Sequence, residues 1–140
     1  MKDKLTFQYT IPGDDFTRAG EASSSIKNKL KQLGVDDTAI RKTAIAMYEG
    51  EINMVIHADG GTISVSISDS VIEMILSDQG PGIKDIAKAM QAGYSTAPEE
   101  VRSLGFGAGM GLPNMKKFSD EFQIESTPGV GTTVTMKVFL

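Results

Sequence analysis

Glu49 and Asn53 form the first pair of side chains in this sequence whose types and spacing could do chemistry. They are four residues apart in a stretch with helical periodicity, so they are neighbours on one face of a helix. That face lies about 100° around the helix from Tyr48 and Ile52, at the edge of an apolar stripe, where polar side chains can line a pocket. There Glu49 is a candidate base for a hydroxyl or a water, and the amide oxygen of Asn53 is a candidate ligand for Mg²⁺. The alternative is two ordinary surface residues.

A second carboxylate, Asp78, ends a stretch whose alternation predicts a strand. The period of two places it on the side of that strand's apolar residues, where an ionised group needs a hydrogen-bonding partner. The amino group of an adenine would supply donors, and Gly80 and Gly82 let the backbone approach a base closely. Thr132, in the last predicted strand, faces the same side and could join Asp78 around the base. The alternative for this segment is a tight turn, for which the same residues are also suited.

Glycine occupies every second position from residue 105 to residue 111. A helix or strand would be weakened by this pattern, since each such glycine costs about 0.5–1 kcal/mol relative to alanine. Gly111 directly precedes a predicted helix, and free backbone amides at a helix start attract phosphate. The spacing matches neither the P-loop nor the dinucleotide-binding fingerprint. The alternatives are a phosphate-binding loop of another kind and a flexible loop that binds nothing.

The rest of the sequence predicts the elements that must position these residues. Alternation predicts strands at residues 4–11, 62–68, 71–78, 121–126 and 132–140. Periodicity and capping signals predict helices at residues 16–33, from Asp36 or Asp37 to about residue 58, at 83–92 and at 112–118. Helices grouped against one mixed, mostly antiparallel sheet define an α+β fold, a two-layer sandwich covered by helices on one face. Residues 1–140 are expected to form a single domain.

The long second helix has an apolar stripe that predicts which face is buried. The stripe consists of Ile45, Tyr48, Ile52, Val55 and Ile56. Glu51 lies on a different face from Glu49 and Asn53 and is expected to be exposed to solvent. His57, the one histidine of the chain, is expected to cap carbonyls at the end of this helix or to pack there.

Composition argues against several classes of function. The chain has 140 residues, 40% hydrophobic and 23% charged, with a net charge of −4, which is typical of a soluble globular protein. Without cysteine it has no disulfide or thiolate metal site, and with one histidine a zinc site is not expected. No block of Lys and Arg indicates nucleic-acid binding. We see no apolar run of about 20 residues, as a membrane span would need, and no charged-then-apolar leader, as secretion would need. A cytoplasmic location is therefore expected.

Four polar or glycine-rich segments, in their order along the chain, resemble the N, G1, G2 and G3 boxes of the GHKL ATPases. This superfamily contains gyrase, Hsp-ninety-type chaperones, MutL and sensor histidine kinases. The segments are Glu49-x-x-x-Asn53, Asp78-Gln79-Gly80-Pro81-Gly82, Gly105–Leu112 and Gly129-Val130-Gly131-Thr132-Thr133. The resemblance implies ATP and Mg²⁺, with Glu49 as base, Asn53 on the metal and Asp78 on adenine. The nucleotide contacts that it implies are Asn53, Asp78, Gly80, Gly82, Ile83, Gly107, Gly109, Met110, Gly111, Leu112 and Thr132.

The short chain further resembles the compact bacterial serine/threonine kinases of the RsbW and RsbT type, which act as anti-sigma or partner-switching factors. The segment Tyr94–Ser103 is similar to the lid of those kinases, which implies that Arg102 approaches the terminal phosphate as a second catalytic residue. Two departures from the family pattern are the insert Leu104–Ala108 in the lid and Met54 directly after Asn53.

This resemblance implies transfer of the γ-phosphoryl group of ATP to a serine or threonine of a small STAS-type antagonist protein. A sigma factor as a second partner and a homodimer are further implications. One alternative is a non-catalytic module in which ATP sets the conformation for sequestering a sigma factor or another regulatory partner. Another is an ATPase module that hydrolyses ATP to drive assembly.

Overall fold

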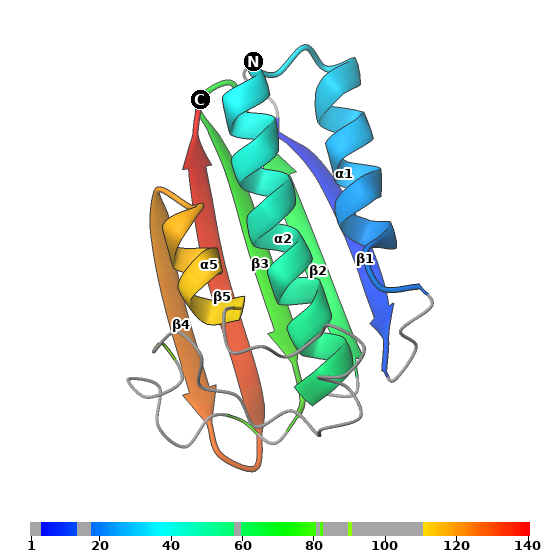
Figure 1. Cartoon of the computed structure of the whole chain (residues 1–140), viewed down its shortest axis with the longest axis vertical. Coiled ribbons are helices and arrows are strands. Elements are labelled where there is room, and N and C mark those ends of the chain that lie inside the picture. Colours follow the sequence, from blue (N-terminus) through cyan, green and yellow to red (C-terminus); the bar gives the residue numbers. More distant parts are fainter. Residues whose placement is uncertain (1–3, 14–17, 58–59, 81, 83–89, 91–110) are drawn as a thin grey trace.

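The computed structural model describes residues 4–13, 18–57, 60–80, 82, 90 and 111–140. The elements, labelled as in Figure 1, are β1 (Leu5–Pro12), α1 (Glu21–Gln32), α2 (Asp37–His57), β2 (Gly60–Ile67), β3 (Val71–Asp78), α5 (Gly111–Lys117), β4 (Glu121–Thr127) and β5 (Gly131–Phe139). Each predicted strand is present to within two residues at either end. The helix predicted at residues 83–92 lies outside the described residues, except for residue 90, as does the glycine-rich segment up to residue 110.

The strands form one sheet in the order β1-β2-β3-β5-β4, and each of the four pairings is antiparallel. The hairpin between β2 and β3 closes where the Ser68 N–H donates to the carbonyl of Val71 at 3.0 Å. Helices α1, α2 and α5 lie together over one face of this sheet (Figure 1). The predicted α+β two-layer sandwich is therefore confirmed.

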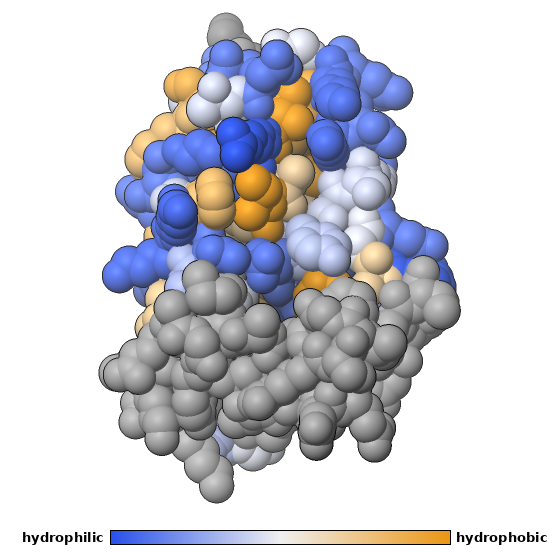
Figure 2. All heavy atoms as spheres, viewed as in Figure 1, coloured by the Kyte–Doolittle hydropathy of each residue, from blue (hydrophilic) through white to orange (hydrophobic). Residues whose placement is uncertain are grey.

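The core lies between the sheet and the helices. Across the sheet, Val65, Met74 and Met136 stand in register on neighbouring strands, and each is fully buried. From the helical layer, Leu30 of α1 and Met47 of α2 are also fully buried. Each such side chain contributes about 1.5–3 kcal/mol by leaving water. In Figure 2 the helical face is largely hydrophilic, with hydrophobic residues visible mainly in a narrow strip along its middle.

Helix α1 starts later than the sequence predicts. Residues 18–20 form a bend and turn, and the helix begins at Glu21. Gly20 immediately before it has a φ of 98°, a left-handed conformation that glycine adopts without strain. The prediction of a helix from residue 16 is therefore wrong over residues 18–20, whereas its predicted end near Gly34 is confirmed.

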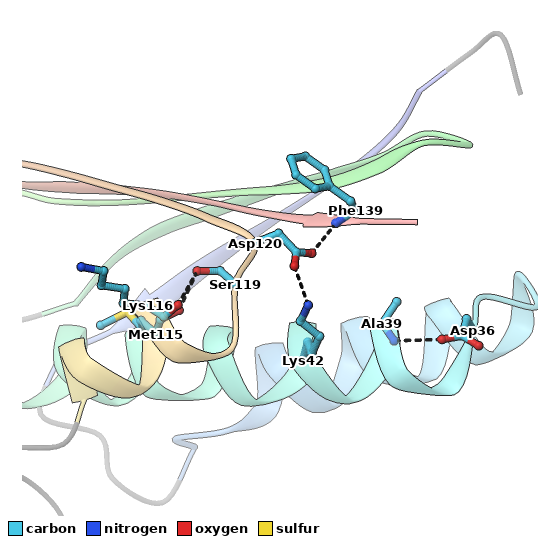
Figure 3. A network of polar contacts seen from close by, with 8 residues as sticks. All are labelled: Asp36, Ala39, Lys42, Met115, Lys116, Ser119, Asp120 and Phe139. Atoms are coloured by element: carbon cyan, nitrogen blue, oxygen red, sulfur yellow. Dashed lines mark hydrogen bonds and ion pairs between the residues drawn. The ribbon is translucent and has the colours of Figure 1, made fainter.

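Helix α2 is fixed to its surroundings at its first turns. The Asp36 carboxylate accepts the N–H groups of Thr38 and Ala39 at 3.0 and 3.4 Å, so Asp36 is the N-cap, one of the two caps predicted. Five residues into the helix, Lys42 donates to Asp120 at 2.6 Å. The second oxygen of Asp120 accepts the N–H of Phe139 at 2.8 Å (Figure 3). We call this set Lys42–Asp120–Phe139 the Asp120 latch.

The buried face of α2 is rotated from the predicted stripe. Ile52 and Val55 are buried as predicted, but Tyr48 is 39% exposed. Glu51 is only 2% exposed, so the prediction that it faces solvent is wrong. The reason is that α1 covers the flank of α2 on which Glu51 lies. Within the described residues, no helix combines the length and the apolar character needed to cross a membrane.

Candidate functional site

The described parts of the four predicted segments lie at one end of the molecule. In Figure 1 this is the lower end, where α2 and β3 finish, α5 begins and β4 turns into β5. The antiparallel register brings Asp78 at the end of β3 opposite Thr132 at the start of β5. The fold thus gathers segments that are far apart in sequence.

Gly50 brings the helix turn that carries Glu49 close to the sheet. Gly50 is buried, and a Cβ atom placed on it would overlap the Leu76 side chain of β3 and lie 3.4 Å from the sulfur of Met115. A larger residue at this position would force the Leu76 side chain to move. Leu76 is two residues before Asp78 on the same strand face, so the contact also sets the height of Glu49 relative to the end of β3.

Glu49, on α2, is half-buried on the side of the helix that faces α5. Burial raises the pKa of its carboxyl above the ordinary value of 4.5, and a hydrogen bond from the Asn114 side chain offsets part of that rise. A carboxylate whose pKa is raised in this way is a stronger proton acceptor than a solvated one. Asn114, on α5, is a site neighbour that sequence reasoning missed, because no local pattern links residues 49 and 114.

Asn53 lies one turn further along α2 and faces the start of α5. A Cβ atom on Gly111 would be 2.8 Å from Oδ1 and 3.0 Å from Nδ2 of Asn53, so the glycine leaves room for the amide. The described residues contain no group of three or more His, Cys, Asp or Glu side chains able to hold a metal. A single amide oxygen nevertheless fits Mg²⁺, which keeps several waters and takes its other ligands from phosphates.

Asp78 is half-buried at the end of β3. Its Oδ1 accepts the N–H of Gly80 at 2.9 Å. Gly61 lies alongside, where a Cβ would be 3.1 Å from the Cβ of Asp78. The neighbouring Thr132 is 9% exposed, and its hydroxyl is 2.8 Å from that of Ser126. The structure thus places Asp78 and Thr132 side by side, with the threonine hydroxyl bonded to Ser126.

The second and fourth segments touch through their glycines. A Cβ atom on Gly82 would overlap the carbonyl oxygen of Thr127, and one on Gly131 would overlap the carbonyl oxygen of Asp78. The β4–β5 turn beside them is closed by the Val130 N–H, which donates to Thr127 at 3.0 Å, and Val130 itself is 64% exposed. Backbone therefore lines this part of the site closely, as contact with a flat base requires.

The structure brings together a subset of the residues proposed for the site. Leu112 is half-buried and packs against the core beside Gly111. The other proposed residues, Ile83, Arg102, Gly107, Gly109 and Met110, lie outside the described residues. Glu51 was missed in the sequence, although its place four residues after Met47 and four before Val55 puts it on the buried stripe.

Comparison with known proteins defines the class. Residues 14–138 match the sequence model of the histidine kinase-like ATPase domain. The chain belongs to this family, and ATP is the nucleotide of the family.

Within the family, the chain is related to bacterial anti-sigma factors and to a serine/threonine kinase. It is 40% identical to an anti-sigma F factor of Caldanaerobacter subterraneus over 76% of this chain and 73% of that protein. It is 34% identical to the serine/threonine-protein kinase RsbT of Bacillus subtilis over 77% of this chain and 78% of that protein. A crystal structure of the RsbU and RsbW domains of a Mycobacterium tuberculosis protein shares the fold, with a TM-score of 0.62 and 17% identity over 98% of this chain and 32% of that one.

Proposed function

We propose that this chain is an ATP-dependent serine/threonine kinase of the anti-sigma regulatory class. It would transfer the γ-phosphoryl group to a serine or threonine of a small STAS-type antagonist protein. The observation that carries the proposal is the half-buried Glu49, with its raised pKa, on the same helix face as Asn53 and next to the start of α5. Kinship with an anti-sigma F factor and with RsbT supports it.

Glu49, Asn53 and Asp78 would each have a different role in phosphoryl transfer. Glu49 accepts the proton of the incoming hydroxyl while the new oxygen–phosphorus bond forms and the bond to the departing ADP breaks. Asn53 would hold Mg²⁺ through its amide oxygen, and the metal would supply charge neutralisation at the phosphates. Asp78 would accept the adenine amino group, with Thr132 and the backbone of Gly80 and Gly82 beside the base.

The residues outside the described ranges complete the proposal. Arg102 would stabilise the terminal phosphate, and the segment containing Gly107, Gly109 and Met110 would contact the phosphates through its backbone. Ile83 would pack near the base. A sigma factor is proposed as the second protein partner, since relatives of this chain are anti-sigma factors.

The test is transfer of radiolabelled phosphate from ATP to a STAS protein. That protein is recovered from a lysate of the source organism by pull-down with this chain. Glu49→Gln is expected to keep ATP affinity and to lose transfer by about 10²–10⁴-fold, the usual contribution of a general base. Glu125→Gln, on an exposed residue of β4, is the matched control and should transfer normally.

Two results would count against this proposal. Full transfer by Glu49→Gln would show that the base is another group. ATP-dependent binding of the STAS protein or a sigma factor without any labelling by the unaltered chain would favour the non-catalytic binding module instead.

A further inference from the structure

One buried carboxylate, Glu51, has no part in the mechanism above. It is 2% exposed and accepts three backbone N–H groups from the start of α1. One carboxylate oxygen accepts from Gly20 at 2.9 Å and from Ala22 at 3.1 Å, and the other accepts from Ser23 at 3.1 Å. A carboxylate in the core requires hydrogen-bond donors to replace the water that it has lost. Here all three donors come from the start of α1.

Glu51 supplies the cap that α1 lacks. The first N–H groups of a helix have no partner within the helix, and a side chain at the N-cap usually accepts one of them. At α1 the N-cap is Gly20, which has no side chain. Glu51 takes its place from α2, about 30 residues further along the chain, so the start of one helix is fastened to the middle of another.

The contact falls on the same helical turn as Glu49. The turn Tyr48–Glu51 is held on three sides. Gly20 packs on Tyr48, where a Cβ would be 3.2 Å from the ring, Gly50 packs on Leu76, and Glu49 is bonded to Asn114. Glu49 faces α5 and Glu51 faces α1, on nearly opposite flanks of the helix. The contacts of Glu51 therefore oppose any rotation of α2 that would carry Glu49 away from α5.

We propose that Glu51 is a positioning residue for phosphoryl transfer. By binding the start of α1 it fixes the rotation of the α2 turn that presents Glu49 to the reacting hydroxyl. This inference rests on the proposed kinase function for its catalytic consequence. Its structural part, the coupling of the α1 start to the Glu49–Asn114 contact, can be measured without catalysis.

The test variant is Glu51→Gln, which keeps the size of the side chain but turns an NH₂ group toward N–H donors. We expect the amides of Gly20, Ala22 and Ser23 to lose hydrogen-exchange protection. We also expect the side-chain amide resonances of Asn114 to shift, because they report its bond to Glu49. Transfer should fall about tenfold or more, since misplacement by about 1 Å can cost 10²-fold, while the Kd for ATP changes less than threefold.

The matched control is Asp120→Asn, which breaks the Asp120 latch two turns earlier on α2 and away from the α1 start. Both variants are compared at temperatures that give them equal stability. A second route is Gly20→Ala, which strains a φ of 98° and crowds Tyr48 without removing a charge. Gly20→Ala should change hydrogen-exchange protection, the Asn114 resonances and the transfer rate in the same direction as Glu51→Gln does. It replaces Glu51→Gln if that variant does not fold.

The outcomes are distinct. Lost protection at the three amides together with shifted Asn114 resonances, absent in Asp120→Asn, supports the inference. Unchanged Asn114 resonances despite lost protection would overturn it and leave Glu51 as a cap alone. A transfer rate no lower than that of Asp120→Asn at equal stability would also overturn it. Failure of the unaltered chain to transfer phosphate would refute the kinase proposal, and the resonances of Asn114 would still decide the role of Glu51.

Discussion

Replacing Gly111 by alanine should weaken the binding of Mg·ATP without lowering the stability of the fold. The added methyl carbon would stand 2.8 Å from Oδ1 of Asn53, whereas ordinary contact begins at 3.4 Å. The amide oxygen must therefore retreat by about 0.6 Å. The side chain can do so because the amide is its flexible end, so the fold survives. Alanine also favours the helix over glycine, by up to about 1 kcal/mol in a helix interior and less at its first residue.

The cost should appear in the metal-dependent part of binding. If the displaced amide loses about 1.4 kcal/mol of its interaction with the metal, binding of Mg·ATP should weaken by about tenfold. Binding of ATP in the presence of EDTA should hardly change. Calorimetric titration with and without Mg²⁺ measures both quantities, and a thermal melt shows whether Tm is kept or raised.

A double-mutant cycle with Asn53→Ala isolates the contact. Once the amide is gone, Gly111→Ala should have no further effect on the affinity for Mg·ATP. An equal loss in both backgrounds would show that the methyl group acts elsewhere. Unchanged affinity in the single variant would refute the role of Asn53 as a metal ligand positioned by this glycine.

Three further outcomes are expected. Asp78→Asn should weaken ATP binding about 10- to 100-fold by loss of a charge-assisted hydrogen bond, with or without Mg²⁺, as titration calorimetry would reveal; an unchanged Kd would rule out its contact with adenine. The acid limb of kcat/KM should have its midpoint above 4.5, because Glu49 must be deprotonated and burial raises its pKa; a pH–rate profile with a midpoint at or below that value contradicts this. Hydrogen bonds from Lys42 and Phe139 lower the pKa of Asp120 below 3.8, so its contribution is present above that pH and is lost as the pH falls toward the lowered value. Asp120→Asn should therefore reduce the free energy of unfolding by about 1 kcal/mol at pH 7 and by less in acid, measured with urea; a pH-independent difference would disprove that linkage.

Sequence reasoning predicts the sheet well because each strand carries its own signal. The alternation in Val71–Asp78 fixes which residues face inward, and the burial of Ile72, Met74 and Leu76 agrees with it. The Asp36 cap is equally local, since its acceptor and donors are within three residues. Such features depend on neighbours in the chain and need no knowledge of tertiary contacts.

The errors concern features that depend on distant residues. The start of α1 at Glu21 and the burial of Glu51 have one cause, because the acceptor for the N–H groups of α1 comes from α2. A pattern within residues 16–33 cannot contain that information. Glu51 was assigned to solvent because it lies on a different helix face from Glu49 and Asn53, although its spacing from Met47 and Val55 placed it on the buried face. A charged residue on an apolar stripe is therefore a candidate cap for the start of a distant helix.

The exposed Val130 offers a practical route to watching this end of the molecule. The chain contains no cysteine, so Val130→Cys would create a unique thiol without any background substitutions. Its side chain projects from the β4–β5 turn, next to Gly131, whose backbone abuts Asp78 and Gln79. A fluorophore attached there would sit beside the proposed nucleotide site, where arrival of a ligand or an incoming protein should change its emission in real time.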